Sequence, residues 1–122
     1  MRLVCLSDTH KLHDRLVIPD GDVLIHAGDL SGRGSLDDIA RCGAFFGRLP
    51  HRHKVIIAGN HDFSFEDERA ERARAALGDV VYLQDQAAVI EGVKFYGSPW
   101  QPRFFDWAFN LDRGAPLKAK WD

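Results

Sequence analysis

Three short apolar runs, each followed by polar side chains, constrain the fold of this chain more than any other feature. The runs are Leu3 to Ser7, Val23 to Ala27 and Val55 to Ala58. Their length and their content of β-branched residues are typical of buried strands. The residues that follow them are Asp8-Thr9-His10, Gly28-Asp29 and Gly59-Asn60-His61. We therefore predict three strands that each deliver polar side chains at the carboxyl end.

Two other segments have the signals of helices. Ser35 can cap a helix, with Asp38 three residues later, and this helix must end before Pro50. The segment Glu66 to Leu77 is rich in Glu, Arg and Ala and is followed by Gly78, a common helix stop. Because strands and helices alternate along the chain, we predict an α/β fold with a largely parallel sheet.

The C-terminal third of the chain has a different pattern. Short strands are expected at Val80 to Leu83, Ala87 to Ile90 and Val93 to Tyr96, with a hairpin turn at Glu91-Gly92. The segment Gly97 to Trp121 holds three Pro, three Phe and all three Trp, without a clean periodicity. We expect this segment to form an ordered loop and a short helix that cover another part of the protein.

Length and composition exclude several classes of protein. A chain of 122 residues with 45% apolar content suits one domain, residues 1–122. The formal net charge of −2 gives no positive field, so nucleic acid is not a favoured partner. No apolar run approaches the roughly 20 residues of a membrane span, so we expect no membrane partner. We expect Cys5 and Cys42 to be free thiols, with Cys5 buried, in a soluble protein of the reducing cytoplasm.

The polar residues after the three runs could form one site. In open α/β sheets, ligands bind beyond the carboxyl ends of the strands. Alone, each residue has an ordinary explanation as a helix cap, a turn residue or a surface histidine. Together they are harder to explain, because any one turn needs only one such group. Carboxylate and imidazole donors suit Mn²⁺, Fe or Zn²⁺ better than Ca²⁺, so the sequence predicts a metal site. Its candidate residues are Asp8, His10, Asp29, Asn60 and His61.

The same residues carry a resemblance to a known family. Asp8-Thr9-His10, Gly28-Asp29 and Gly59-Asn60-His61-Asp62 resemble the DxH, GD and GNH[DE] blocks of the calcineurin-like metallophosphoesterases. The later segments Gly97 to Pro102 and Phe109 to Leu111 are similar to the MPPED-like branch of that superfamily. The resemblance extends over essentially the whole chain, and three ordered motifs make it specific.

The resemblance implies a role for each candidate residue in a site with two divalent metal ions. Asp8 and His10 would bind the first ion, Asp29 would bridge both ions, and Asn60 would bind the second. His61 would act on the substrate, where it could stabilise developing charge and protonate the leaving oxygen. Two such ions polarise phosphoryl oxygens and turn a bound water into a nucleophile near neutral pH. Asp62 could orient His61 by a hydrogen bond, or it could have a structural role in the turn.

The resemblance is incomplete on its C-terminal side. Family members continue with a GH block and a GHxH block, which supply three further histidine ligands and the second half of an α/β-β/α sandwich. The sequence up to Asp122 holds neither block. We therefore expect the N-terminal half of the sandwich, with an incomplete metal shell and an exposed sheet face that favours a homo-oligomer. Among the remaining histidines, we expect His26 in the core and His51 and His53 facing solvent.

These observations predict a metal-dependent phosphoesterase. The expected substrate is a small phosphoester, and more specifically a phosphodiester, with nucleotides among the candidates. Two alternatives stay open. A chain without the later histidine blocks could bind metal or nucleotide weakly and have no activity. The aromatic segment Trp100 to Trp121 could instead form a protein-interaction surface.

Overall fold

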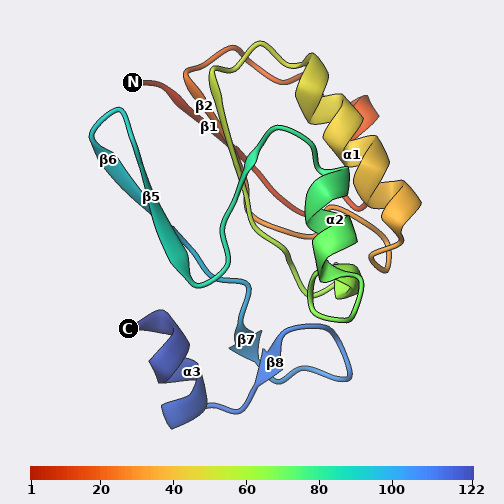
Figure 1. Ribbon diagram of the computed structural model, residues 1–122, viewed down its shortest axis with the longest axis vertical. Helices are drawn as coiled ribbons and strands as arrows, with labels where there is room; N and C mark the ends of the chain where they lie inside the picture. Colours follow the sequence, from red (N-terminus) through yellow and green to blue (C-terminus); the bar gives the residue numbers. More distant parts are fainter.

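The computed structural model describes residues 1–122, and its centre is a four-stranded parallel sheet (Figure 1). The strands are β1 (Leu3–Leu6), β2 (Val23–His26), β3 (His53–Ile56) and β4 (Val81–Tyr82). They lie in the order β1-β2-β3-β4, and each neighbouring pair is parallel. The predicted α/β fold is confirmed. Since the strands share one direction, the polar loops after β1, β2 and β3 all leave the same edge of the sheet.

Two helices lie side by side over one face of this sheet (Figure 1). The first, α1 (Leu36–Arg48), begins at the predicted cap, because the Ser35 hydroxyl accepts a hydrogen bond from Asp38 N at 3.1 Å. It ends before Pro50, as predicted. The second helix is α2 (Ala70–Ala76). Ile39 and Phe46 from α1 and Leu77 after α2 pack against the sheet and form the main core.

The prediction that a helix begins at Glu66 and runs to Leu77 is wrong at its N-terminal end. A 3-10 turn, η2 (Phe63–Phe65), is followed by turns, and α2 begins only at Ala70. The cause is a local interaction, in which the Asp67 carboxylate accepts hydrogen bonds from the Arg69 backbone N at 2.8 Å and from its guanidinium at 2.6 Å. Such side-chain to backbone bonds compete with helical hydrogen bonds.

A β-hairpin covers part of the opposite sheet face. It consists of β5 (Gln86–Ile90) and β6 (Val93–Gly97), which pair in antiparallel fashion. The predicted turn is confirmed: Glu91 and Gly92 have φ of 49° and 80°, and a two-residue type I′ turn requires a positive φ at both positions. Ile90 of the hairpin joins a small core with Val23 of β2, Val55 of β3 and Leu83, which follows β4.

The C-terminal segment forms a separate corner of the molecule, beyond the carboxyl edge of the sheet (Figure 1). It contains the short parallel pair β7 (Gln101–Pro102) and β8 (Asn110–Leu111), followed by α3 (Ala115–Trp121). The remaining element is η1 (His13–Arg15), in the loop after β1. The expected ordered loop and short helix are therefore confirmed. None of the helices combines the length and apolar content that a membrane span needs.

The predicted environments of Cys5 and His51 are wrong. Both cysteines are free, as predicted, but Cys5 is exposed, since Val4 takes the buried face of β1 and the small core beneath the hairpin draws no residue from β1. His51 is only 4% exposed, and its Nε2 donates a hydrogen bond to the Pro19 carbonyl oxygen at 2.9 Å. His53 is half-buried within β3.

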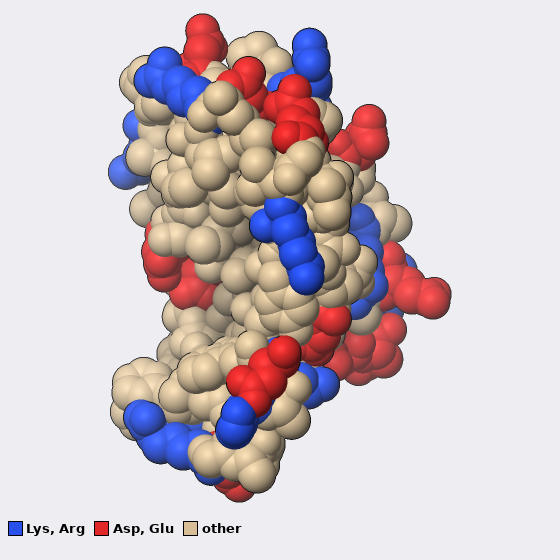
Figure 2. Space-filling view, turned by 90° about the vertical axis from the view of Figure 1, so that its left-hand side faces the viewer, with Lys and Arg blue, Asp and Glu red and all other residues tan.

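The face that carries the hairpin has a broad uncharged area. The Lys, Arg, Asp and Glu side chains of this face lie mostly around the margin of the uncharged area, with both signs of charge mixed (Figure 2). Exposed apolar side chains of the chain include Leu3, Val89 and Tyr96, and the last two belong to the hairpin. An oligomer formed through this face stays a prediction.

Candidate metal centre

The loops after β1 and β2 run beside each other and are joined by backbone hydrogen bonds. Asp8 N donates to Gly28 O at 2.9 Å, and His10 N donates to Asp29 O at 3.0 Å. These loops hold Asp8, His10 and Asp29 at φ of 56°, 44° and 60°, in a region that non-glycine residues rarely adopt. Such conformations persist where the surrounding structure enforces them, and they cluster at functional sites.

Two glycines allow the loops after β2 and β3 to touch. Gly28 has φ of 106°, and a Cβ at this position would lie 2.8 Å from the Gly59 Cα. A Cβ on Gly59 would collide with the Asp29 carboxylate. Only glycine fits at either position, which gives a physical reason for the GD and GN pairs in the sequence.

The carboxylate of Asp62 ties the loop after β3 to the loop after β2. It is fully buried and accepts hydrogen bonds from Leu30 N, Ser31 N and Gly59 N at 3.1, 3.0 and 2.9 Å. A fourth bond comes from the Ser31 hydroxyl at 2.6 Å. Of the two roles considered for Asp62, the structural role in the turn is the one that these contacts describe.

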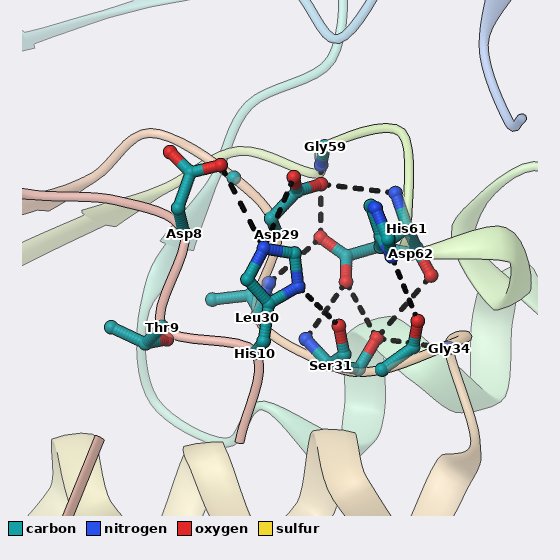
Figure 3. Close-up of polar contacts among 12 residues, drawn as sticks. Asp8, Thr9, His10, Asp29, Leu30, Ser31, Gly34, Gly59, His61 and Asp62 are labelled. Atoms are coloured by element: carbon teal, nitrogen blue, oxygen red, sulfur yellow. Dashed lines mark hydrogen bonds and ion pairs between the residues drawn. The ribbon is translucent and has the colours of Figure 1, made fainter. Parts of the chain in front are cut away.

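Possible metal donors converge where the three loops meet (Figure 3). One ligand atom from each of His10, Asp29 and His61 lies within 4.8 Å of the other two. His10 Nε2 is 3.7 Å from Asp29 Oδ2 and 3.9 Å from Asp8 Oδ1. The rings of His10 and His61 meet edge to face, with 4.5 Å between their centroids. Four predicted residues are thus close enough to serve a single site.

Backbone carbonyls orient both histidines of the site. His61 Nδ1 donates to Gly32 O at 2.9 Å, and His10 Nδ1 donates to Ser31 O at 3.3 Å. Because a carbonyl oxygen can only accept, each Nδ1 must carry the proton. This leaves the Nε2 atoms of His10 and His61 as the free nitrogens. Metal-binding histidines commonly have such a second hydrogen bond, which fixes the tautomer and the ring orientation.

The two carboxylates of the site have pKa values shifted in opposite directions. A hydrogen bond from the Ser7 side chain is the main cause that lowers the pKa of Asp8. Burial is the main cause that raises the pKa of Asp29, and the shared hydrogen bond with Asp8 adds to this rise. Close carboxylates with separated pKa values are typical of functional sites, where bound cations can compensate their repulsion.

Asn60 lies in the wall of a pocket of about 290 Å³ beside these donors. Asp8, Asp29 and the segment 98–101 also line this pocket. Within that segment, the Ser98 hydroxyl oxygen is buried and has no hydrogen-bond partner. All five predicted site residues therefore lie at one edge of the sheet: His10, Asp29 and His61 form the donor cluster, Asp8 lies beside His10, and Asn60 lines the adjoining pocket.

The sequence of this chain matches a known protein family. Residues 1–117 match the family of calcineurin-like phosphoesterases. The chain belongs to this family. The α/β fold and the ordered DxH, GD and GNH blocks, which the sequence analysis identified by resemblance, are thus those of a calcineurin-like phosphoesterase.

Several curated proteins are similar to this calcineurin-like domain along its whole length. The human metallophosphoesterase domain-containing protein 1 is 38% identical, with 99% of this chain and 44% of the human protein covered. The UPF0046 protein C25E10.12 of Caenorhabditis elegans is 41% identical, with 100% of this chain and 49% of that protein covered. The chain spans about half the length of the curated relatives it matches.

The residues of the site fit the divalent metals that calcineurin-like phosphoesterases use. The donors are imidazole nitrogens and carboxylate oxygens, a mixture typical of Mn²⁺, Fe and Zn²⁺ sites. Donor atoms of His10, His61 and Asp29 belong to one cluster, and both rings are held in place by backbone carbonyls. Both the donor atoms and the hydrogen bonds that orient the two imidazole rings therefore suit a metal ion.

Residue-by-residue reasoning missed two parts of this calcineurin-like site. Trp107 stacks on His61, with 4.1 Å between ring centroids and 29° between ring planes. Trp100 and Gln101 line the pocket beside Asn60. The available signal is the aromatic segment after Gly97. The sequence predicts that this segment covers another part of the protein, but it does not indicate which part.

Proposed function

We propose that this chain hydrolyses phosphodiesters in a metal-dependent reaction. Two divalent ions would be held by Asp8, His10, Asp29 and Asn60, and His61 would act on the substrate. The observation that carries the proposal is the cluster in which donor atoms of His10, Asp29 and His61 lie within 4.8 Å of one another. Membership of the calcineurin-like phosphoesterase family supports the same chemistry.

The proposed chemistry divides between the metal and the chain. When bound, divalent ions polarise phosphoryl oxygens and lower the pKa of a coordinated water. His61 would hold its proton on Nδ1, where the Gly32 carbonyl fixes it, and would present Nε2 to the ester. A protonated Nε2 can donate to the leaving oxygen, which is the usual task of a general acid. Asn60 would also lie beside a small substrate in the pocket.

The test compares turnover with and without metal. The purified chain is stripped with a chelator, reloaded with Mn²⁺ and given bis(p-nitrophenyl) phosphate or p-nitrophenyl phosphate. We expect Mn²⁺-dependent release of nitrophenol, faster from the diester, in the wild type and in His53→Gln, a control histidine outside the site. Asp29→Asn should lose the activity.

Two outcomes would contradict the proposal in different ways. A chain that binds Mn²⁺ but turns over neither ester would be the weak metal-binding module that the sequence analysis left open. A chain that hydrolyses both esters equally well after chelation would have an active site that does not depend on these residues.

A further inference from the structure

A second hollow, with aromatic walls, lies next to the candidate metal centre. It has a volume of about 420 Å³ and is lined by Arg33, Phe104, Phe105, Asp106 and Trp107. Phe104 and Phe105 are 57% and 75% exposed, although large apolar side chains are usually buried. We call residues 104–107 the aromatic strap. Neither the fold nor the proposed metal site requires these two phenyl rings at the surface.

The aromatic strap is joined directly to the residues of the site. Trp107 stacks on the His61 ring at 4.1 Å. The next residue, Ala108, donates its backbone N–H to the Asn60 carbonyl oxygen at 2.9 Å. The hollow therefore begins one ring away from the histidine that is proposed to act on the substrate.

The strap is held in an unusual backbone conformation. Phe105 has φ of 49°, which is a genuine outlier for a bulky residue. The Asn110 side chain supports this conformation, because its Nδ2 donates to Phe105 O at 2.8 Å and its Oδ1 accepts from Phe104 N at 3.3 Å. Burial does not compensate for this strain, since the Phe105 ring remains exposed. An enforced conformation that displays an aromatic ring beside a candidate site points to a ligand that uses the ring.

The chemistry of the hollow indicates which ligand this could be. Aromatic faces stack on planar rings, and a guanidinium can add a cation–π contact. The Arg33 guanidinium is exposed and lies over the Trp107 ring, 5.2 Å from its centroid. The volume is sufficient for a single planar ring system beside an ester held at the metal centre.

We propose that the aromatic strap, with Arg33, binds the alcohol part of the substrate and selects phosphoesters whose alcohol carries a planar aromatic ring. This inference rests on the proposed function, because it assumes that the phosphoryl group lies at the metal centre near His61.

The test measures binding of three phosphonates, which cannot be hydrolysed, to the Mn²⁺-loaded chain by calorimetry. They carry a methyl, a cyclohexyl or a phenyl group on the same charged head. A stacking contact should make phenylphosphonate bind about 5- to 100-fold more tightly than methylphosphonate. Cyclohexylphosphonate separates stacking from simple burial of apolar area, and it should bind more weakly than the phenyl compound.

Two variants test whether the preference for the phenyl compound depends on the Phe105 ring. Phe105→Leu keeps an apolar side chain but removes the ring, so it should lower the phenyl-to-methyl affinity ratio. Val89→Ala, at a residue that is 70% exposed on the hairpin, is the matched control and should keep the full ratio.

Equal affinity of the wild type for the three phosphonates would overturn the inference and leave the proposed function standing. Failure of the wild type to bind any phosphonate would overturn both. If Phe105→Leu keeps the ratio but changes the oligomeric state in light scattering, the rings form a protein contact and the inference is wrong.

Discussion

Asp62 accepts two hydrogen bonds from Ser31, one from its backbone N at 3.0 Å and one from its hydroxyl at 2.6 Å. With the bonds from Leu30 N and Gly59 N, these contacts hold the loops after β2 and β3 in one arrangement. Removal of the carboxylate would leave buried donors without partners, which costs more than the bonds themselves contribute.

Asp62→Ala should therefore destabilise the protein by about 3 kcal/mol or more. The measurement is the free energy of unfolding in urea, in the presence of a chelator so that metal binding does not contribute. Asp20→Ala removes an exposed carboxylate and should change stability by less than about 0.5 kcal/mol. Similar stability of the two variants would mean that the loops do not depend on Asp62.

Asn60 and His61 are neighbours with different proposed roles, and metal content can separate them. Asn60→Ala should lose metal affinity. His61→Ala should keep its metal and lower kcat by about 10²- to 10⁴-fold, as expected for loss of a general acid. Because His61 also belongs to the donor cluster, equal metal loss in both variants would make it a ligand and contradict the assigned role.

The local features of this protein were predictable from sequence. The strands follow from apolar runs, and α1 follows from its Ser35 cap, because each signal lies within a few residues of the element it specifies. Where a contact depends on a distant partner, the prediction fails. His51 looks solvent-facing until Pro19, far away in the sequence, supplies a carbonyl. The α2 boundary shifts for the opposite reason, since the short-range pair of Asp67 and Arg69 outweighs helix propensity.

The same distinction applies to the site. The position of Asp8, Asp29 and Asn60 at one edge of the sheet could be predicted, because each lies a few residues after the end of a strand whose direction is predictable. The stack of Trp107 on His61 could not be predicted, because it depends on how the irregular segment after β6 folds back over the sheet edge. That segment has no periodicity from which a path could be inferred.

The pH dependence of stability should reflect His26. Burial is the main cause that lowers the pKa of His26 to about 4, whereas an unfolded histidine titrates near 6.5. Between these values the unfolded chain binds more protons than the folded chain, so stability must fall as the pH decreases from about 6.5 to about 4. The loss attributable to His26 can reach about 3 kcal/mol.

Urea unfolding at several pH values in this range measures the effect. His26→Gln should have a lower stability at pH 7, because its bonds to Thr9 and Gly28 N are altered, and a weaker dependence on pH. An unchanged pH dependence in the variant would assign the acid sensitivity to other groups.

The two thiols should differ strongly in reactivity. Cys5 is exposed, whereas Cys42 is fully buried, and burial raises the pKa of the Cys42 thiol to about 12. Since the thiolate is the reactive form, a thiol reagent should label one cysteine in the folded protein and two after unfolding. Cys5→Ser should remove the rapid labelling. Rapid labelling of Cys42 in that variant would mean that the core under α1 opens readily.

We propose that the polar loops after β1, β2 and β3 form a metal centre in which Asp29 is the shared ligand. The most direct measurement is elemental analysis of the wild type, Asp29→Ala and the control Asp20→Ala after equilibrium dialysis against Mn²⁺. We predict that the wild type and Asp20→Ala retain Mn²⁺ and that folded Asp29→Ala loses most of it. Wild-type metal content in folded Asp29→Ala would contradict the account.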